Sequence, residues 1–218
     1  NVVAGEVSMK HHLTGGHHVL AAACASGSIA IAEGYSAVLS GREDVCLAGG
    51  ADSPLTLSMY GAWLNLRVLA KDPEPEKACR PFDKRRDGIV LAEGAGLLAL
   101  EELEHARARG AKIYAEILGA GTTSNAAHIT KPEVAGQAGA VERCLRNARL
   151  RPEDVDYINA HGTATLLNDV TETQAIKRVL GERAYRIPIS STKSILGHSM
   201  GASGAIETIV TILALQQQ

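Results

Sequence analysis

The sequence has few aromatic residues, no long hydrophobic run and no marked excess of charge of either sign. Aromatic residues make up 3% of the 218 residues, so there is no series of aromatic and basic side chains that could stack on nucleic-acid bases. No apolar run approaches the roughly 18–20 residues of a membrane-spanning helix, and no signal peptide is visible. The formal net charge is −2. These absences favour a cytoplasmic protein that binds neither nucleic acid nor membranes.

The cysteines and the clustered histidines form no recognisable metal-binding or disulfide pattern. No two cysteines have the CxxC spacing, so we expect reduced thiols and no zinc site. The four positions are Cys24, Cys46, Cys79 and Cys144. Two histidine pairs, at 11–12 and 17–18, have no cysteine or carboxylate between them. We interpret these as exposed or dimer-interface histidines and expect no bound metal.

Glycine and small apolar side chains are abundant, which suits closely packed α/β layers. The chain has 22 glycines and is 45% hydrophobic. Apolar runs predict strands at residues 19–24, 45–49, 113–118, 155–160 and 187–191, with a strand-like end to 89–100. Helices are predicted at residues 26–39, 101–109, 136–149, 171–180 and 204–215, and a proline-containing loop at 72–76. This alternation predicts an α/β fold with largely parallel strands.

One cysteine and two histidines stand beside glycine and other small residues at the ends of apolar runs. Cys24 precedes a predicted helix, whose dipole and free N–H groups favour a thiolate and can stabilise an oxyanion. A buried structural cysteine is the alternative, and for His161 the alternative is a polar residue that ends a strand. With His198, these groups could form a thioester and polarise a second carbonyl. That combination indicates carbon–carbon bond chemistry on thioesters rather than simple hydrolysis.

Polar residues close to the histidines extend this candidate site. Thr163 and Thr165 offer two hydroxyls that could hold an amide-rich substrate arm. Lys193 and Glu207 flank His198 and could form a buried charge pair, with a surface lysine and a solvated glutamate as the alternative. Residues 19–39 and 187–215 also resemble each other as strand, reactive residue, small residues and helix. Two such units would place both reactive groups near helix N-termini.

Four motifs occur in a fixed order along the chain. They are Ala22-Ala23-Cys24-Ala25-Ser26-Gly27, Arg80-Pro81-Phe82-Asp83-Lys84-Arg85-Arg86-Asp87-Gly88, Asn159-Ala160-His161-Gly162-Thr163-Ala164-Thr165 and Ser191-Thr192-Lys193-Ser194-Ile195-Leu196-Gly197-His198. Together they closely resemble the β-ketoacyl-[acyl-carrier-protein] synthases, most of all the synthase II type. The resemblance covers nearly the whole chain. It implies a thiolase-like layered α-β-α-β-α fold, with residues 1–110 ending the N-terminal half and residues 111–218 forming most of the C-terminal half.

The resemblance also implies a role for each matching residue. Cys24 would accept the acyl group, while His161 and His198 would assist malonyl decarboxylation and stabilise the enolate or thioester oxygen. The remaining matches are Lys193 near the second histidine, Glu207 as its support, Thr163 and Thr165 on the phosphopantetheine arm, and Trp63 at the acyl pocket. The implied reaction is a decarboxylating Claisen condensation. It requires no metal or organic cofactor and needs acyl carrier protein as a partner, and a homodimer is implied as well.

The chain departs from the family at two points. Leu166 and Asn168 replace the usual proline and glycine, which resembles the ketosynthases of aromatic polyketide and nodulation-factor pathways. Family members are also longer and carry a glycine-rich gating loop that we do not find. We therefore expect a central fragment, incomplete at both ends, that does not catalyse condensation by itself.

Two other classes of protein remain as alternatives. A non-catalytic partner subunit, like the chain-length factors that form heterodimers with polyketide ketosynthases, has the same fold but lacks the nucleophile, which this chain retains. A cysteine-dependent acyl hydrolase needs only one histidine. It would leave the second glycine–histidine motif and Lys193 unexplained.

Overall fold

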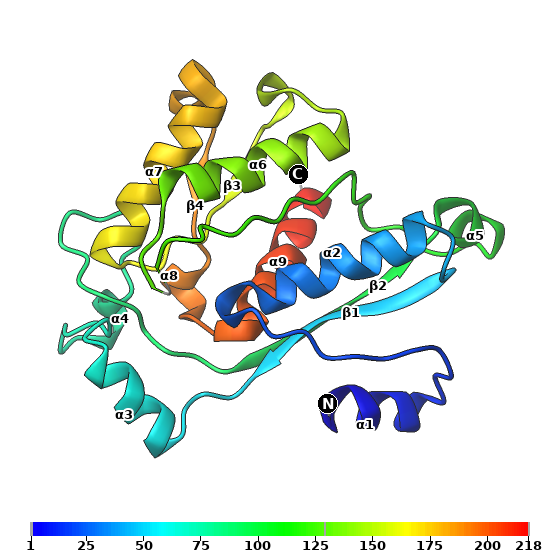
Figure 1. Ribbon diagram of the computed structural model, residues 1–218, viewed down its shortest axis with the longest axis horizontal. Helices are drawn as coiled ribbons and strands as arrows, with labels where there is room; N and C mark the ends of the chain where they lie inside the picture. Colours follow the sequence, from blue (N-terminus) through cyan, green and yellow to red (C-terminus); the bar gives the residue numbers. More distant parts are fainter. Residues whose placement is uncertain (1, 129, 218) are drawn as a thin grey trace.

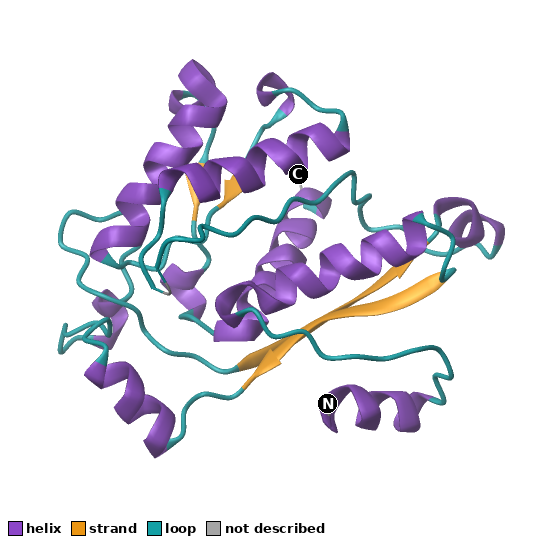
Figure 2. Ribbon diagram, in the orientation of Figure 1, coloured by secondary structure: helices purple, strands orange, loops and turns teal. Residues whose placement is uncertain are grey.

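The computed structural model describes residues 2–128 and 130–217, in which helices are the main elements (Figures 1 and 2). The helices are α1 (Val2–His11), α2 (Ser26–Leu39), α3 (Leu57–Asn65), α4 (Pro75–Ala78), α5 (Leu103–Ala108), α6 (Val134–Ala148), α7 (Leu166–Leu180), α8 (Lys193–Leu196) and α9 (Ser203–Gln216). The strands are β1 (Val45–Asp52), β2 (Gly94–Glu101), β3 (Ile158–Asn159) and β4 (Ile189–Ser190). Short 3-10 turns include η1 (Ala23–Ala25) and η4 (Met200–Ala202). No described helix is both long and apolar enough to cross a membrane.

The long ribbon β1–β2 carries the two helices that lead away from the candidate site. The strands pair antiparallel, from Val45 opposite Glu101 to Asp52 opposite Gly94. Helix α2 packs on β1 and helix α9 on β2, and the two helices also contact each other (Figure 1). Their shared core contains Ile31, Ala48 and Ala205. Small side chains let these layers approach closely, in keeping with the abundance of alanine and glycine.

A second packed unit surrounds the short parallel pair β3–β4. Ile158 pairs with Ile189 in this sheet. Helix α7 covers it, with Ile176 and Leu180 packed against Ile187. Helix α6 packs against α7, with its axis in a different direction (Figure 1). The carboxyl ends of β3 and β4 lead directly into the segments that carry His161 and Lys193.

The charged segment at residues 80–88 joins these two units. Arg86 lies beside Asp169 of α7, with 3.5 Å between Nε and Oδ2. The backbone N–H of Phe82 donates to the same carboxylate at 2.7 Å. The side chain of Asp169 is 1% exposed, so this acidic group is compensated entirely by contacts within the protein. Arg86 also donates from Nε to the carbonyl oxygen of Thr165 at 3.1 Å, so the segment contacts the loop that follows His161.

The predicted helices are confirmed more often than the predicted strands. Helix α2 has the predicted bounds, and α5, α6 and α9 differ only at their ends. Helix α7 begins five residues early, because the Thr165 hydroxyl caps it by accepting from the N–H of Asn168. Helix α4 begins inside the predicted loop, where Pro75 occupies the first helical turn and its missing N–H costs nothing.

Several strand predictions are wrong. Residues 19–24 and 113–118 form no strand, since no described strand runs beside either segment to complete a ladder. The strands predicted at 155–160 and 187–191 shorten to two residues each. The pair β1–β2 is antiparallel, so the expectation of largely parallel strands holds only for β3–β4. The boundary expected at residues 110 and 111 stays a prediction.

Candidate active site

Two similar turns bring Cys24 and His198 together. Turn η1 contains Cys24 and opens α2, while η4 follows His198 and opens α9. Each turn includes a non-glycine residue in the left-handed region, Ala23 with φ 48° and Met200 with φ 45°. Such backbone costs of order 1–3 kcal/mol and persists where surrounding contacts enforce it. The internal similarity predicted between residues 19–39 and 187–215 is therefore present in these turns and the helices they open, but residues 19–24 form no strand before Cys24.

The two helix N-termini approach closely because glycine lies at their contact. A Cβ atom on Gly27 would lie 2.8 Å from the carbonyl oxygen of Gly201, and one on Gly204 would lie 2.0 Å from the Oγ of Ser28. Only a residue without a side chain fits at either point. The carboxylate of Asp52, at the end of β1, accepts the N–H of Gly201 at 2.9 Å. These contacts hold η1 and η4 side by side.

The side chains of Cys24 and His198 are in direct contact. The Nε2 atom of His198 lies 3.1 Å from the Sγ atom of Cys24. The other ring nitrogen, Nδ1, lies 2.8 Å from the hydroxyl of Ser203, which fixes the orientation of the ring. The ring of His161 meets that of His198 edge to face, with centroids 5.4 Å apart and an interplanar angle of 84°. The structure thus brings together the three residues singled out in the sequence.

A buried charge pair supports the loop of His161. The ammonium group of Lys193, whose side chain is 2% exposed, donates to the carboxylate of Glu207. It also donates to the carbonyl oxygen of His161 at 2.8 Å. Lys193 is therefore buried and Glu207 is largely buried beside it, so the alternative of a surface lysine and a solvated glutamate is wrong.

Glu172 of α7 is a further support that the sequence reasoning missed. Its carboxylate accepts the backbone N–H groups of His161 at 2.7 Å and of Gly162 at 2.8 Å. Burial raises the pKa of Glu172, and these two hydrogen bonds oppose that rise. Glu172 lies eleven residues after His161, where the sequence shows only one glutamate on a polar helix. Ser203 was missed as well, because a serine at a helix start reads as an ordinary cap.

Burial sets the protonation of the reactive groups. It lowers the pKa of His198 to about 3, with the charge of Lys193 acting in the same direction. Burial, Lys193 and His198 hold the pKa of His161 well below its usual range. Burial raises the pKa of Cys24, although Lys193 opposes the rise. The predicted lowering of the thiol pKa is therefore wrong, because the loss of water outweighs the nearby positive charge. At neutral pH the site holds a thiol and two uncharged imidazoles.

An apolar cluster lies against the sulfur of Cys24. Leu69, Ile89, Leu91 and Met200 form its buried part, and Cys24, Trp63 and Val68 pack against it. The sulfur atoms of Cys24 and Met200 are 4.0 Å apart. Trp63 is thus brought to the same cluster as the cysteine.

The two threonines lie in the loop between β3 and α7. The hydroxyls of Thr163 and Thr165 are 2.9 Å apart, and Thr165 also caps α7. Thr163 is buried, whereas Leu166, the first residue of α7, is exposed. Both threonines follow His161 closely, but their hydroxyls are already engaged with each other and with backbone.

The other three cysteines lie outside this cluster of reactive groups, and all four cysteines are free thiols. Cys46 lies on β1, and Cys144 of α6 lies 3.5 Å from the carbonyl oxygen of Gly119. Cys79 donates to the carbonyl oxygen of Lys193 at 2.8 Å. Burial raises the pKa of each of these thiols. Cys79 thus contacts the backbone of the site, which nothing in its sequence surroundings indicated.

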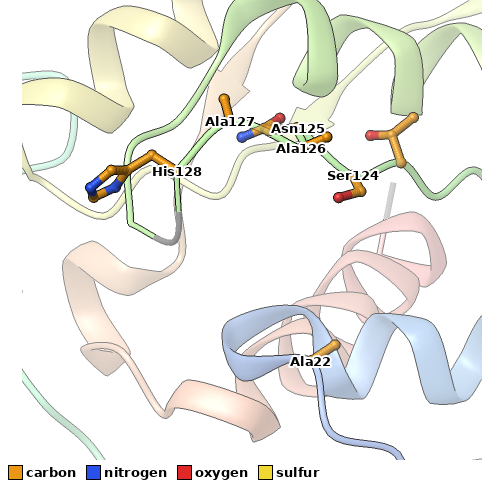
Figure 3. A pocket seen from close by; sticks show the side chains of 7 residues that line it. Ala22, Ser124, Asn125, Ala126, Ala127 and His128 are labelled. Carbon is orange, nitrogen blue, oxygen red and sulfur yellow. The ribbon is translucent and has the colours of Figure 1, made fainter.

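An open hollow of about 680 Å³ lies between Ala22, which precedes η1, and the loop at residues 123–128. Figure 3 shows Ala22 on one side and the side chains from Ser124 to His128 on the other. Ala22 is two residues from the nucleophile candidate, but neither histidine of the site lines the hollow. Among the described residues, a cluster of potential metal ligands is formed by Cys24, His161 and His198. The histidine pairs at 11–12 and 17–18 belong to no such described cluster.

Comparisons with known proteins agree with this geometry. The profile of the "Beta-ketoacyl synthase, N-terminal domain" matches residues 1–106, and that of the "Beta-ketoacyl synthase, C-terminal domain" matches residues 114–218. Nodulation protein E of Rhizobium meliloti is 48% identical over 217 residues, which are 100% of this chain and 53% of that protein. The 3-oxoacyl-[acyl-carrier-protein] synthase 2 of Rhizobium meliloti (strain 1021) is 46% identical and covers 99% of this chain and 52% of its own length. The chain thus spans about half the length of these curated relatives.

Solved structures show the same fold. A type II polyketide-synthase acyl-carrier protein in complex with its ketosynthase bound to the hexaketide gives a TM-score of 0.96 at 38% identity, covering 99% of this chain and 54% of that one. A β-ketoacyl synthase from Burkholderia phymatum STM815 gives 0.92 at 42% identity, covering 98% and 52%. These likenesses confirm the thiolase-like layered α/β fold. The chain belongs to the β-ketoacyl synthase family, of the synthase II type.

Proposed function

We propose that the whole protein is a 3-oxoacyl-[acyl-carrier-protein] synthase, which condenses an acyl thioester with malonyl-carrier protein in fatty-acid or polyketide biosynthesis. The observation that carries this proposal is the contact of the Cys24 thiol with His198 at 3.1 Å, with the ring of His161 against that of His198. We assign the nucleophile to the half at residues 1–110 and both histidines to the half at 111–218. The cytoplasm is the proposed compartment, in keeping with four free thiols.

In the first step, the sulfur of Cys24 attacks the carbonyl carbon of the acyl thioester. The thiol proton passes to Nε2 of His198 as the carbon–sulfur bond forms, and it leaves with the sulfur of the carrier. The products are acyl-Cys24 and free carrier thiol. An uncharged imidazole can accept this proton, and the Ser203 hydroxyl supports either tautomer because it can donate to or accept from Nδ1.

In the second step, malonyl-carrier protein loses carbon dioxide and the remaining carbanion attacks acyl-Cys24. The uncharged rings of His161 and His198 each carry one N–H group. These N–H groups donate hydrogen bonds that stabilise the enolate and thioester oxygens. The new carbon–carbon bond expels the sulfur of Cys24 as a thiolate, which takes up one proton from solvent. The product is the 3-oxoacyl-carrier thioester, so atoms and electrons balance without an oxidant or reductant.

The surrounding residues position these groups. Lys193 and Glu207 hold the carbonyl of His161, and we assign them a supporting role rather than proton transfer. The apolar cluster with Trp63 suits the acyl chain next to Cys24. Thr163 and Thr165 are assigned to the amide-rich phosphopantetheine arm, for which they would exchange their present hydrogen bond.

Acyl carrier protein is the proposed partner, because it carries both thioesters. A relative of known structure was solved as a ketosynthase with its acyl-carrier protein, and another as a ketosynthase with a chain-length factor. A homodimer, or a heterodimer with a related subunit, is proposed for this chain on the same likeness. We propose no resident metal or organic cofactor for the condensation.

The test separates the nucleophile from the histidines in the whole protein as its gene encodes it. Cys24→Gln should lose acylation while keeping malonyl decarboxylation, because the glutamine amide resembles an acylated site. His161→Ala and His198→Ala should still accept an acyl group but lose condensation, and acylation of His198→Ala should be the slower of the two because the proton acceptor Nε2 is gone. Cys144→Ser, which changes a thiol outside the cluster, should keep both steps.

One result would favour the cysteine hydrolase instead. Equal loss of acylation in the Cys24 and both histidine variants, without malonyl decarboxylation in any of them, would indicate a simple cysteine–histidine pair. A chain-length-factor-like subunit would show neither step in the unaltered protein.

A further inference from the structure

The three reactive side chains also form a compact set of ligand atoms for a metal ion. One ligand atom each from Cys24, His161 and His198 lies within 4.8 Å of the others. The separation of Sγ and Nε2 of His198 is 3.1 Å. Zinc bonds sulfur at about 2.3 Å and imidazole nitrogen at about 2.0–2.1 Å, so tetrahedral zinc places such atoms roughly 3.3–3.7 Å apart. The Cys24–His198 pair is already close to this range, and zinc would draw the remaining ligand atoms, now up to 4.8 Å apart, closer together.

The surroundings of the three ligands suit a borderline or soft cation. The Ser203 hydroxyl holds Nδ1 of His198, which leaves Nε2 directed at the sulfur, as an outer partner does in histidine–metal sites. The thioether of Met200 lies 4.0 Å from the thiol sulfur. No carboxylate belongs to the cluster found among the described residues. Hard cations such as Mg²⁺ prefer oxygen ligands and have nothing to bind here.

The positive charge of Lys193 does not exclude a cation. Lys193 lowers the pKa of both histidines and so opposes a cation there, but its ammonium group is paired with the carboxylate of Glu207, which offsets part of this charge. Binding replaces the thiol proton by the metal, and the proton leaves to solvent. The bound thiolate then offsets one of the two charges of the ion. A water molecule or substrate atom would complete the fourth position, as in open zinc sites.

We propose that Cys24, His161 and His198 bind Zn²⁺ reversibly, and that the bound ion withholds the thiol from acylation. This inference concerns metal binding by the free protein and goes beyond the proposed condensation. Its consequence is that the condensing form must be free of zinc. The histidine pairs at 11–12 and 17–18, all exposed, offer a competing and weaker site that the test has to separate.

The test uses the untagged whole protein, first treated with a chelator and then titrated with Co²⁺ and Zn²⁺. We expect one Co²⁺ ion to bind per chain and to give a sulfur-to-cobalt charge-transfer band in the near ultraviolet. Zn²⁺ should displace the Co²⁺ and abolish the band, whereas Mg²⁺ should not. Cys24→Ser should abolish the band, and His161→Ala should weaken Zn²⁺ binding at least tenfold. Two control variants should retain both the charge-transfer band and the affinity for Zn²⁺. They are Cys144→Ser and a variant with His11, His12, His17 and His18 changed to Gln.

A second readout needs no metal spectrum. Zn²⁺ should slow alkylation of Cys24 by iodoacetamide at least tenfold and leave Cys144 unaffected. A charge-transfer band that survives in Cys24→Ser, or alkylation of Cys24 that Zn²⁺ does not slow, would overturn the proposal. Circular dichroism of each variant shows whether a lost signal reflects unfolding. Because no acyl substrate is used, failure of this proposal leaves the proposed condensation untouched.

Discussion

The Nε2 atom of His198 lies 3.1 Å from the Sγ atom of Cys24, although 174 residues separate the two in sequence. The contact exists because two turns of the same kind open α2 and α9, whose N-termini meet at glycines. Burial makes this a pair of uncharged groups, a thiol and an imidazole, rather than a thiolate with an imidazolium. The nucleophile is therefore activated when substrate arrives, by proton transfer, and not beforehand.

This uncharged pair predicts how Cys24 reacts with a simple alkylating agent. Burial raises the pKa of the thiol above its ordinary value of 9.0, so little thiolate exists at neutral pH. The rate of alkylation by iodoacetamide should rise about tenfold per pH unit between pH 7 and 9. Peptide mass spectrometry after timed quenching measures this rate at each cysteine. A rate for Cys24 that is already constant at pH 7 would contradict the uncharged pair.

The close approach of the two helices predicts a cost for any side chain at Gly27. Gly27→Ala places a Cβ 2.8 Å from the carbonyl oxygen of Gly201 and should destabilise the fold by about 1–3 kcal/mol. Gly61→Ala is the matched control, because nothing lies within 4 Å of its Cβ and α3 gains a better helix former. Urea unfolding of both variants measures the difference. Equal stabilities would show that the helices do not meet at Gly27.

The buried pair of Arg86 and Asp169 predicts a large loss of stability when one partner is removed. Asp169→Ala leaves the N–H of Phe82 without its acceptor and Arg86 without its buried counter-charge, and it should cost about 3–5 kcal/mol. Glu104→Ala removes the exposed ion pair with Arg107 and should leave unfolding unchanged within error. Chemical denaturation compares the two. A small effect of Asp169→Ala would mean that the 80–88 segment does not join the two units through this residue.

The lowered pKa of His198 predicts loss of stability in mild acid. In the unfolded chain this histidine titrates near pH 6.5, whereas in the folded protein burial lowers its pKa to about 3. The folded state binds fewer protons, so its stability is full above pH 6.5 and falls by about 1.4 kcal/mol per pH unit below it. Denaturant midpoints at pH 7 and pH 5 should differ less in His198→Gln than in the unaltered protein. If the midpoints at pH 7 and pH 5 differed equally in both proteins, a group other than His198 would cause the loss of stability in acid.

The sequence identified the reactive residues because their local signals are strong. A cysteine or histidine beside glycines at a helix start is visible within a few positions, and Cys24, His161 and His198 do lie together. Lys193 and Glu207 were placed correctly near His198, since a lysine and a glutamate on either side of one loop invite pairing. Helices α2, α5, α6, α7 and α9 were also predictable, whereas α1, α3, α4 and α8 were not predicted.

The sequence-based predictions that failed concern features that depend on contacts between residues distant in sequence. Residues 113–118 have the composition of a strand, but a strand needs a neighbour, and none of the described strands lies beside them. The role of Glu172 follows from the placement of α7 over the His161 loop, which no local pattern reveals. The raised pKa of Cys24 has the same origin. Burial depends on tertiary packing, while the helix N-terminus that suggested a thiolate is a local feature.

The central claim is that Cys24 receives the acyl group, and mapping the acylated cysteine tests it most directly. The whole protein is incubated with an acyl-carrier thioester, digested and examined by peptide mass spectrometry. The contact with His198 and the adjoining apolar cluster predict that the acyl mass appears on Cys24 and is lost in Cys24→Ser. Acylation mainly at Cys46, Cys79 or Cys144 would contradict the account.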